Sequence, residues 1–207
     1  MKKLLILLLS ILIFSSPSVY ADDISDFQIE GISIGDSLLD YMTEDEILEE
    51  IELNKNSYSY LKESNKYVQI SIKKNLRTYD FLAVFIKNNS TSEYITNKNE
   101  KYIIMSVRGM MNFIEDFDSC LKKRDEIVEV VSKMFPNQQK IEDFFVMPSD
   151  PSGESIVDGV YFIFNSGAEI EISCDNFEET YRNKNNWSEG LNVSIDTKEI
   201  LSWGSDW

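Results

Sequence analysis

The sequence predicts an α+β fold, in which an antiparallel sheet made of a meander and a hairpin packs against one long amphipathic helix. Apolar and polar residues alternate in several short segments, which is the pattern of half-buried strands. Between Ile114 and Phe135 the apolar residues are instead spaced three and four apart, as on one face of a helix. The strands lie close together in two groups, a spacing that favours antiparallel hairpins over parallel crossovers.

Residues 1–21 have the features of a cleavable secretory signal. Lys2 and Lys3 precede an apolar run from Leu4 to Phe14, and Val19 and Ala21 occupy the positions that signal peptidase reads. At about 1.5 Å per residue the run spans about 16 Å, which is too short for about 30 Å of hydrocarbon. We therefore expect a mature domain of residues 22–207, periplasmic or secreted, without a lipid or membrane anchor.

The charge balance excludes some partners. Removal of Lys2 and Lys3 leaves 18 basic residues against 36 acidic ones, which changes the net charge from −16 to −18. Such a field repels phosphate backbones and anionic headgroups, so nucleic acid and membrane surfaces are not expected partners. The acidity is explained first by solubility, and a basic protein or peptide is the partner that it would suit as the alternative.

The chain contains no histidine and two cysteines. The absence of histidine removes the usual Ser-His-Asp and Cys-His schemes and the commonest transition-metal ligand. We therefore predict no catalytic residues, no metal site and no cofactor. Cys120 and Cys174 form an even pair in an oxidising compartment, so a structural disulfide is expected.

The first half of the chain should form two short helices, one short strand near its start and a meander of three strands. Asp36 or Ser37 can cap a short helix that ends at Tyr41, after a short strand between two glycines at Ile32–Ile34. Thr43 and Glu46 form a capping box, which predicts an acidic helix over residues 44–52. The strands of the expected meander are at 67–72, 81–86 and 102–107, with a polar loop at 88–101.

The second half begins with the long helix, which Pro136 should end. A hairpin follows, with strands at 160–164 and 168–174 joined by a turn at 165–167. The last strand is expected at 191–195. Thr197 can then cap a short terminal helix that carries Ile200, Leu201 and Trp203.

Several of these segments together resemble a family of small exported proteins from AT-rich marine bacteria. They are IEGISIGDSLLDY near the start, CLKKRDEIV from Cys120, the Val160–Phe162 strand, Cys174, and LNVSI from Leu191 with Lys198 and Glu199. The resemblance implies an exported compartment and this fold, but it brings no catalytic or binding residues. The ending from Trp203 to Trp207 departs from the family's pattern.

The segment 136–157 is predicted to be a long loop marked by three prolines, and such loops are often functional. Its apolar centre makes Phe144, Phe145 and Met147 the candidate binding residues, while docking on the core or an added edge strand is the structural alternative. Asp150, Ser152, Glu154 and Asp158 have the spacing of oxygen ligands but depart from the EF-hand pattern, which favours a solvated loop.

Two classes of function remain open. The first is a non-catalytic binding or interaction module, which the missing histidine favours. The second is a carboxylate-dependent hydrolase, acting for example on glycosides with a pair such as Asp175 and Glu178 or Glu179. Trp187, Trp203 and Trp207 could stack on a sugar or a peptide, or close the edges of the core.

Overall fold

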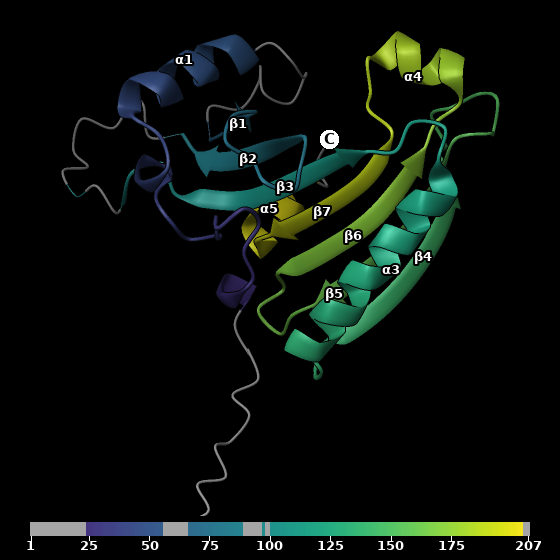
Figure 1. Cartoon of the computed structure of the whole chain (residues 1–207). Coiled ribbons are helices and arrows are strands. Elements are labelled where there is room, and N and C mark those ends of the chain that lie inside the picture. Colours follow the sequence, from purple (N-terminus) through teal and green to yellow (C-terminus); the bar gives the residue numbers. More distant parts are fainter. Residues whose placement is uncertain (1–23, 56–65, 89–96, 98–99, 205–207) are drawn as a thin grey trace, which may run out of the picture.

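The computed structural model describes residues 24–55, 66–88, 97 and 100–204. Within them, seven strands form one antiparallel sheet in the order β1-β2-β3-β7-β6-β5-β4 (Figure 1). The strands are β1 (Tyr67–Ile72), β2 (Phe81–Lys87), β3 (Ile104–Asn112), β4 (Gln139–Val146), β5 (Ile156–Ile163), β6 (Glu169–Asn176) and β7 (Gly190–Asp196). The α+β class and the antiparallel sheet are thereby confirmed. The predicted signal, most of the 88–101 loop and Trp207 lie outside the described residues.

Four α-helices and two 3-10 helices accompany the strands in the described part of the chain. They are η1 (Ile24–Asp26), η2 (Leu38–Asp40), α1 (Glu44–Asn54), α3 (Phe117–Met134), α4 (Glu179–Asn185) and α5 (Lys198–Gly204). The predicted capping box is present, since the backbone N–H of Thr43 donates to Glu46 Oε2 at 2.9 Å and that of Glu46 donates to Thr43 Oγ1 at 3.4 Å. Of the two candidate caps, Ser37 is the one that caps η2. Helix α4 has no counterpart in the prediction.

Two predictions for the first half of the chain are wrong. The segment 32–34 is not a strand, because the chain reverses at Glu30 and Gly31, both with positive φ, and leaves only an isolated bridge between Ile29 and Ile32. The third strand does not end at residue 107. It continues to Asn112, and the absent side chain of Gly109 makes room for the ring of Tyr79.

The predicted loop at 136–157 contains the edge strand β4, which pairs with β5 from Gln139↔Ile163 to Val146↔Ile156. Glu142 and Asp143 interrupt the alternation of the segment, and every residue of the strand is exposed. A strand whose two faces are both exposed has no apolar side to mark it in the sequence.

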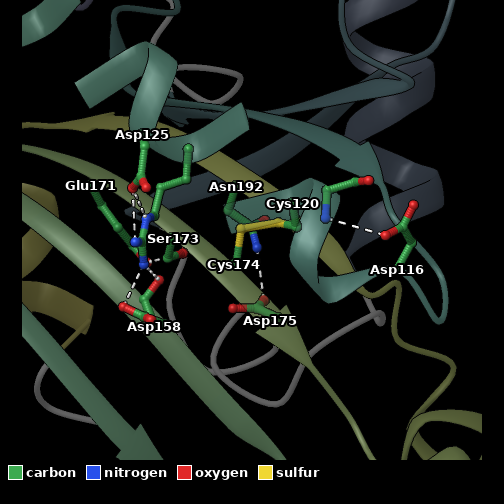
Figure 2. The surroundings of a disulfide bond; sticks show 11 residues. Asp116, Cys120, Asp125, Asp158, Glu171, Ser173, Cys174, Asp175 and Asn192 are labelled. Carbon is green, nitrogen blue, oxygen red and sulfur yellow. Dashed lines mark hydrogen bonds and ion pairs between the residues drawn. A yellow bond between two sulfur atoms is a disulfide. The ribbon is translucent and has the colours of Figure 1, made fainter. Parts of the chain in front are cut away.

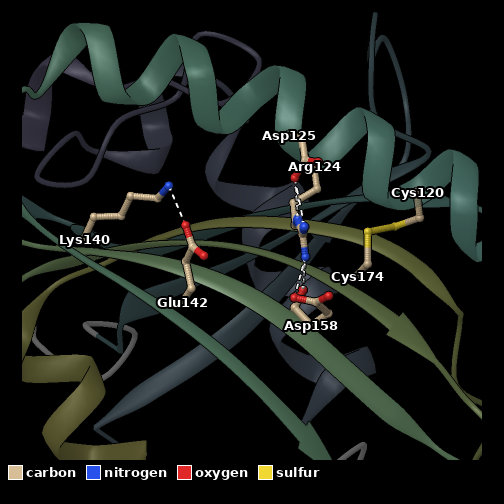
Figure 3. Close-up of polar contacts among 7 residues, drawn as sticks. All are labelled: Cys120, Arg124, Asp125, Lys140, Glu142, Asp158 and Cys174. Atoms are coloured by element: carbon tan, nitrogen blue, oxygen red, sulfur yellow. Dashed lines mark hydrogen bonds and ion pairs between the residues drawn. A yellow bond between two sulfur atoms is a disulfide. The ribbon is translucent and has the colours of Figure 1, made fainter.

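The two faces of the sheet differ in character. The helix face carries apolar residues such as Ile172, Val193 and Ile195, which join the main buried core. Two links attach α3 to this face: the predicted Cys120–Cys174 disulfide (Figure 2), and an ion pair at 2.5 Å from Arg124 Nη1 to Asp158 Oδ1 (Figure 3). The opposite face, here called the pocket face, carries the alternating residues, among them Glu171, Asp175, Asn192 and Asp196.

Candidate functional site

The pocket face bears a cavity of about 700 Å³. Its floor consists of side chains from β1, β2, β3, β6 and β7, which alternate with the core residues of the same strands. Its walls come from α5 and from the segment between α4 and β7. The described residues that line it are Gln69, Phe81, Ala83, Phe85, Ser106, Arg108, Met110, Met147, Glu171, Asp175, Phe177, Asn186, Trp187, Ser188, Asn192, Asp196, Ile200, Leu201, Trp203 and Gly204.

The floor is acidic. Among the described lining residues Arg108 is the one cation, and it faces three carboxylates, those of Glu171, Asp175 and Asp196. Arg108 Nη2 is 3.1 Å from Glu171 Oε2, and Ser173 Oγ donates to Glu171 Oε1 at 2.9 Å. Asp196 is buried and accepts a hydrogen bond of 2.6 Å from Ser194 Oγ. One guanidinium cannot neutralise three carboxylates, so the floor attracts positive charge.

Burial and mutual repulsion raise the pKa values of three carboxyl groups on this face. Burial raises the pKa of Asp175 to about 7, with a further contribution from the charge of Glu171. Burial likewise raises the pKa of Glu169, the register partner of Asp196, to about 7, and it raises the pKa of Asp196. Burial is the largest cause of all three shifts, and neighbouring carboxylates add to it while Arg108 opposes it.

Asp175 and Asn192 form a pair on neighbouring strands of the floor. Asn192 Nδ2 donates to Asp175 Oδ2 at 2.7 Å (Figure 2). The side chain of Asn192 is 3% exposed, and none of the described residues donates a hydrogen bond to its Oδ1. A buried amide oxygen without a donor is uncommon, because it loses water without gaining a partner.

Aromatic groups form the walls, and polar contacts hold them. Trp187 packs against Phe177 and Tyr181, with ring centroids 5.2 and 5.4 Å apart. On the other side Trp203 packs edge-on against Tyr67 at 5.1 Å. Glu199 anchors the helix of Trp203, as its carboxylate accepts a 2.5 Å hydrogen bond from Tyr67 Oη, which is the main reason that its pKa is lowered to about 2.

The candidate binding residues from the sequence are divided between two places. Met147 lines the pocket. Phe144 and Phe145 lie on β4 at the edge of the sheet, are exposed, and are not among the residues that line the cavity. The structural alternative of an edge strand is therefore what the chain adopts there.

The other acidic candidates are not brought together. Asp150 accepts from the backbone N–H groups of Ser152 and Ser155 and from Ser152 Oγ, while Asp158 pairs with Arg124. Glu178 caps α4 by accepting from Thr180 and Tyr181, so its carboxylate is occupied by the backbone. Among the described residues no group of three or more carboxylate or thiol side chains is placed to hold a metal ion.

Sequence reasoning missed Arg108, Glu171, Asn192 and Asp196. The available signal was the position of charged residues inside strands, on the side opposite the apolar ones. Glu169 and Glu171 share one side of β6, and Arg108 interrupts an apolar run in β3. Such a side usually faces water, and only the walls from α5 and residues 186–188 convert it into a pocket.

Comparisons with protein-family models, with curated proteins and with solved structures found no match for this chain. The resemblance to exported marine bacterial proteins therefore stays a prediction. No helix within the described part of the chain is long and apolar enough to cross a membrane.

The raised pKa values predict a pH dependence of stability. The folded chain keeps protons on Asp175 and Glu169 that the unfolded chain releases near pH 4, so stability should fall as the pH rises from about 4 to about 7 and then level off. The melting temperature, measured by circular dichroism, should drop by a few degrees over that range. Asp175→Asn should reduce the drop, whereas Glu49→Gln on the exposed surface of α1 should leave it unchanged. Equal slopes in both variants would mean that general repulsion is responsible.

Proposed function

We propose that this protein is an exported, non-catalytic binding module that takes a positively charged segment of a basic protein or peptide in the pocket on its sheet. The observation that carries the proposal is the excess of carboxylates over cations on the floor of a 700 Å³ cavity with tryptophan on two walls. Cavities of this size suit small ligands or a few peptide residues. The net charge, −16 for the whole sequence and −18 once Lys2 and Lys3 are removed with the signal, adds a long-range attraction for such partners.

Export is part of the proposal. It is supported by the predicted signal in residues 1–21 and by the disulfide between Cys120 and Cys174, since disulfides persist in oxidising compartments. The disulfide and the Arg124–Asp158 ion pair attach α3 to β6 and β5, which supports the proposal that α3 stabilises the sheet on the side opposite the pocket. A rigid floor lowers the entropic cost of binding.

Binding to tetralysine tests the proposal, with tryptophan fluorescence as the readout because Trp187 and Trp203 line the pocket. Affinity should fall as the Debye length shortens from about 30 Å at 0.01 M salt to about 8 Å at 0.15 M. Asp196→Asn should weaken binding at least about tenfold. Glu49→Gln removes the same charge from an exposed helix and should change the affinity little.

Two results would contradict the proposal. Equal weakening by both variants would assign the binding to the overall charge alone. Loss of binding in Phe144→Ser/Phe145→Ser, with Asp196→Asn unaffected, would assign it to the edge strand β4, where those two side chains are exposed. The melting temperature of each variant serves as the folding control.

A carboxylate-dependent hydrolase is the second candidate, and one observation favours it. Asp175, with a pKa raised to about 7, and the ion-paired Glu171 line one pocket with two tryptophans, and glycosidases likewise use one protonated and one ionised carboxyl group. Aryl glycosides would distinguish the candidates. Release of the aryl group at pH 5 to about 7 that disappears in Asp175→Asn would support hydrolysis, and no release would support binding.

A further inference from the structure

The floor of the pocket contains one place where several acceptors converge without enough donors. Asp175 on β6 and Asn192 on β7 come from adjacent strands, where Ser173 is the register partner of Asn192 and Gly190 that of Asp175. Asn192 Oδ1 has no donor among the described residues, and Asp175 meets one amide and no cation at hydrogen-bond distance there. A positively charged hydrogen-bond donor would satisfy both groups, because it would donate to Asn192 Oδ1 and neutralise the Asp175 carboxylate.

We propose that this pair is the subsite for a primary ammonium group, such as a lysine side chain of the ligand, bound between the carboxylate of Asp175 and Oδ1 of Asn192. The inference rests on the proposed function and specifies its ligand. An ammonium carries three donors on a compact centre and can therefore serve acceptors on two different side chains.

The geometry favours an ammonium over a guanidinium. A guanidinium binds a carboxylate best through two parallel hydrogen bonds, one to each oxygen. At Asp175 one oxygen, Oδ2, already accepts a hydrogen bond of 2.7 Å from Asn192 Nδ2. A guanidinium that binds both oxygens would have to displace that amide. One N–H of an ammonium group can donate to Asp175 Oδ1 and leave the hydrogen bond between Asp175 and Asn192 intact.

The surroundings of the pair suit the alkyl stem of a lysine. Phe177 and Trp187 lie on one wall, and the side chains of Met110 and Met147 line the same cavity. Met110 is the register partner of Asn192 on β3. Methionine side chains rearrange easily, so they can admit the ammonium to the closed Oδ1 and then cover the methylene groups of the stem.

The test uses four capped pentapeptides, acetyl-Gly-Gly-X-Gly-Gly-amide, in which X is lysine, arginine, Nε-acetyl-lysine or norleucine. Affinities come from NMR titration of the full mature chain, and the side-chain amide signals of Asn192 report directly on the subsite. The lysine peptide should bind at least about tenfold more tightly than the other three and should shift the Asn192 amide signals.

Two variants complete the test. Asp175→Asn should reduce lysine-peptide affinity at least about tenfold, whereas Asp143→Asn, the same change on the same face of the sheet but outside the lining of the pocket, should not. If the arginine peptide binds as tightly as the lysine peptide, or Asp175→Asn changes nothing, the ammonium subsite is refuted while the basic-ligand function stands. If neither basic peptide binds and tetralysine also fails, the proposed function itself is refuted.

Discussion

Replacing Cys120 and Cys174 together by alanine is expected to lower the free energy of unfolding by about 4 kcal/mol. The disulfide closes a segment with a sequence separation of 54, and a cross-link of that span removes about this much loop entropy from the unfolded chain. It also joins α3 to β6, the strand that carries Asp175 and Glu171. Urea denaturation followed by circular dichroism measures the loss.

The oxidised and reduced forms of the native chain provide the control, since they differ only in the bond. Both the reduced form and the double variant should unfold at lower urea concentrations than the oxidised form. In the oxidised folded protein neither cysteine should react with iodoacetamide. A loss below about 1 kcal/mol, or labelling of Cys120 without reductant, would contradict the expectation.

Replacing Arg182 by methionine is expected to cost about 3 to 5 kcal/mol, because it leaves a buried carboxylate without its cation. Glu189 is 4% exposed, and its Oε2 lies 2.5 Å from Arg182 Nη1. Its other oxygen accepts from the backbone N–H of Glu115. The pair thereby joins α4, the residue that precedes β7 and the turn before α3. Helix α4 also carries the Tyr181 ring that packs against Trp187.

The double variant Arg182→Met/Glu189→Gln tests whether the unpaired charge of Glu189 causes the loss of stability in Arg182→Met. A neutral glutamine still accepts from Glu115 and needs no cation, so the double variant should recover a large part of the stability lost in Arg182→Met. Denaturant midpoints at constant slope measure both. If the single variant loses less than about 1 kcal/mol, or the second change gives no recovery, the unpaired charge is not the cause.

Features that depend on neighbouring residues were predictable from the sequence. The Thr43–Glu46 capping box, the alternation in β1 and the period of α3 act over a few positions, and the structure contains all three. The disulfide was also predictable, because two cysteines allow a single pairing. Local rules therefore account for most of the elements.

The pocket was not predictable, since its residues come from five strands, from α5 and from three connecting segments that meet only after folding. Glu171 and Asn192 satisfy the rule that polar residues alternate with apolar ones, so nothing in their own strands distinguishes them from solvent-facing residues. The two tryptophans gave a partial signal, but whether they close the core or line a pocket depends on how α5 and residues 186–188 lie against the sheet. The sequence did not predict strand β4 for a different reason. All of its residues are exposed, so neither of its faces has an apolar pattern.

The place of β7 affects how the chain can reach this structure. The strand pairs with β3 on one side, as Val107 with Ile195, and with β6 on the other (Figure 1). Until residues 190–196 insert, the β1–β3 and β4–β6 groups can form only as separate hairpin units, each with an open edge. Pairings between distant residues form slowly, so insertion of β7 is expected to limit the folding rate. The seven-stranded sheet is therefore complete only after residues 190–196 have been synthesised and have joined the two groups of strands.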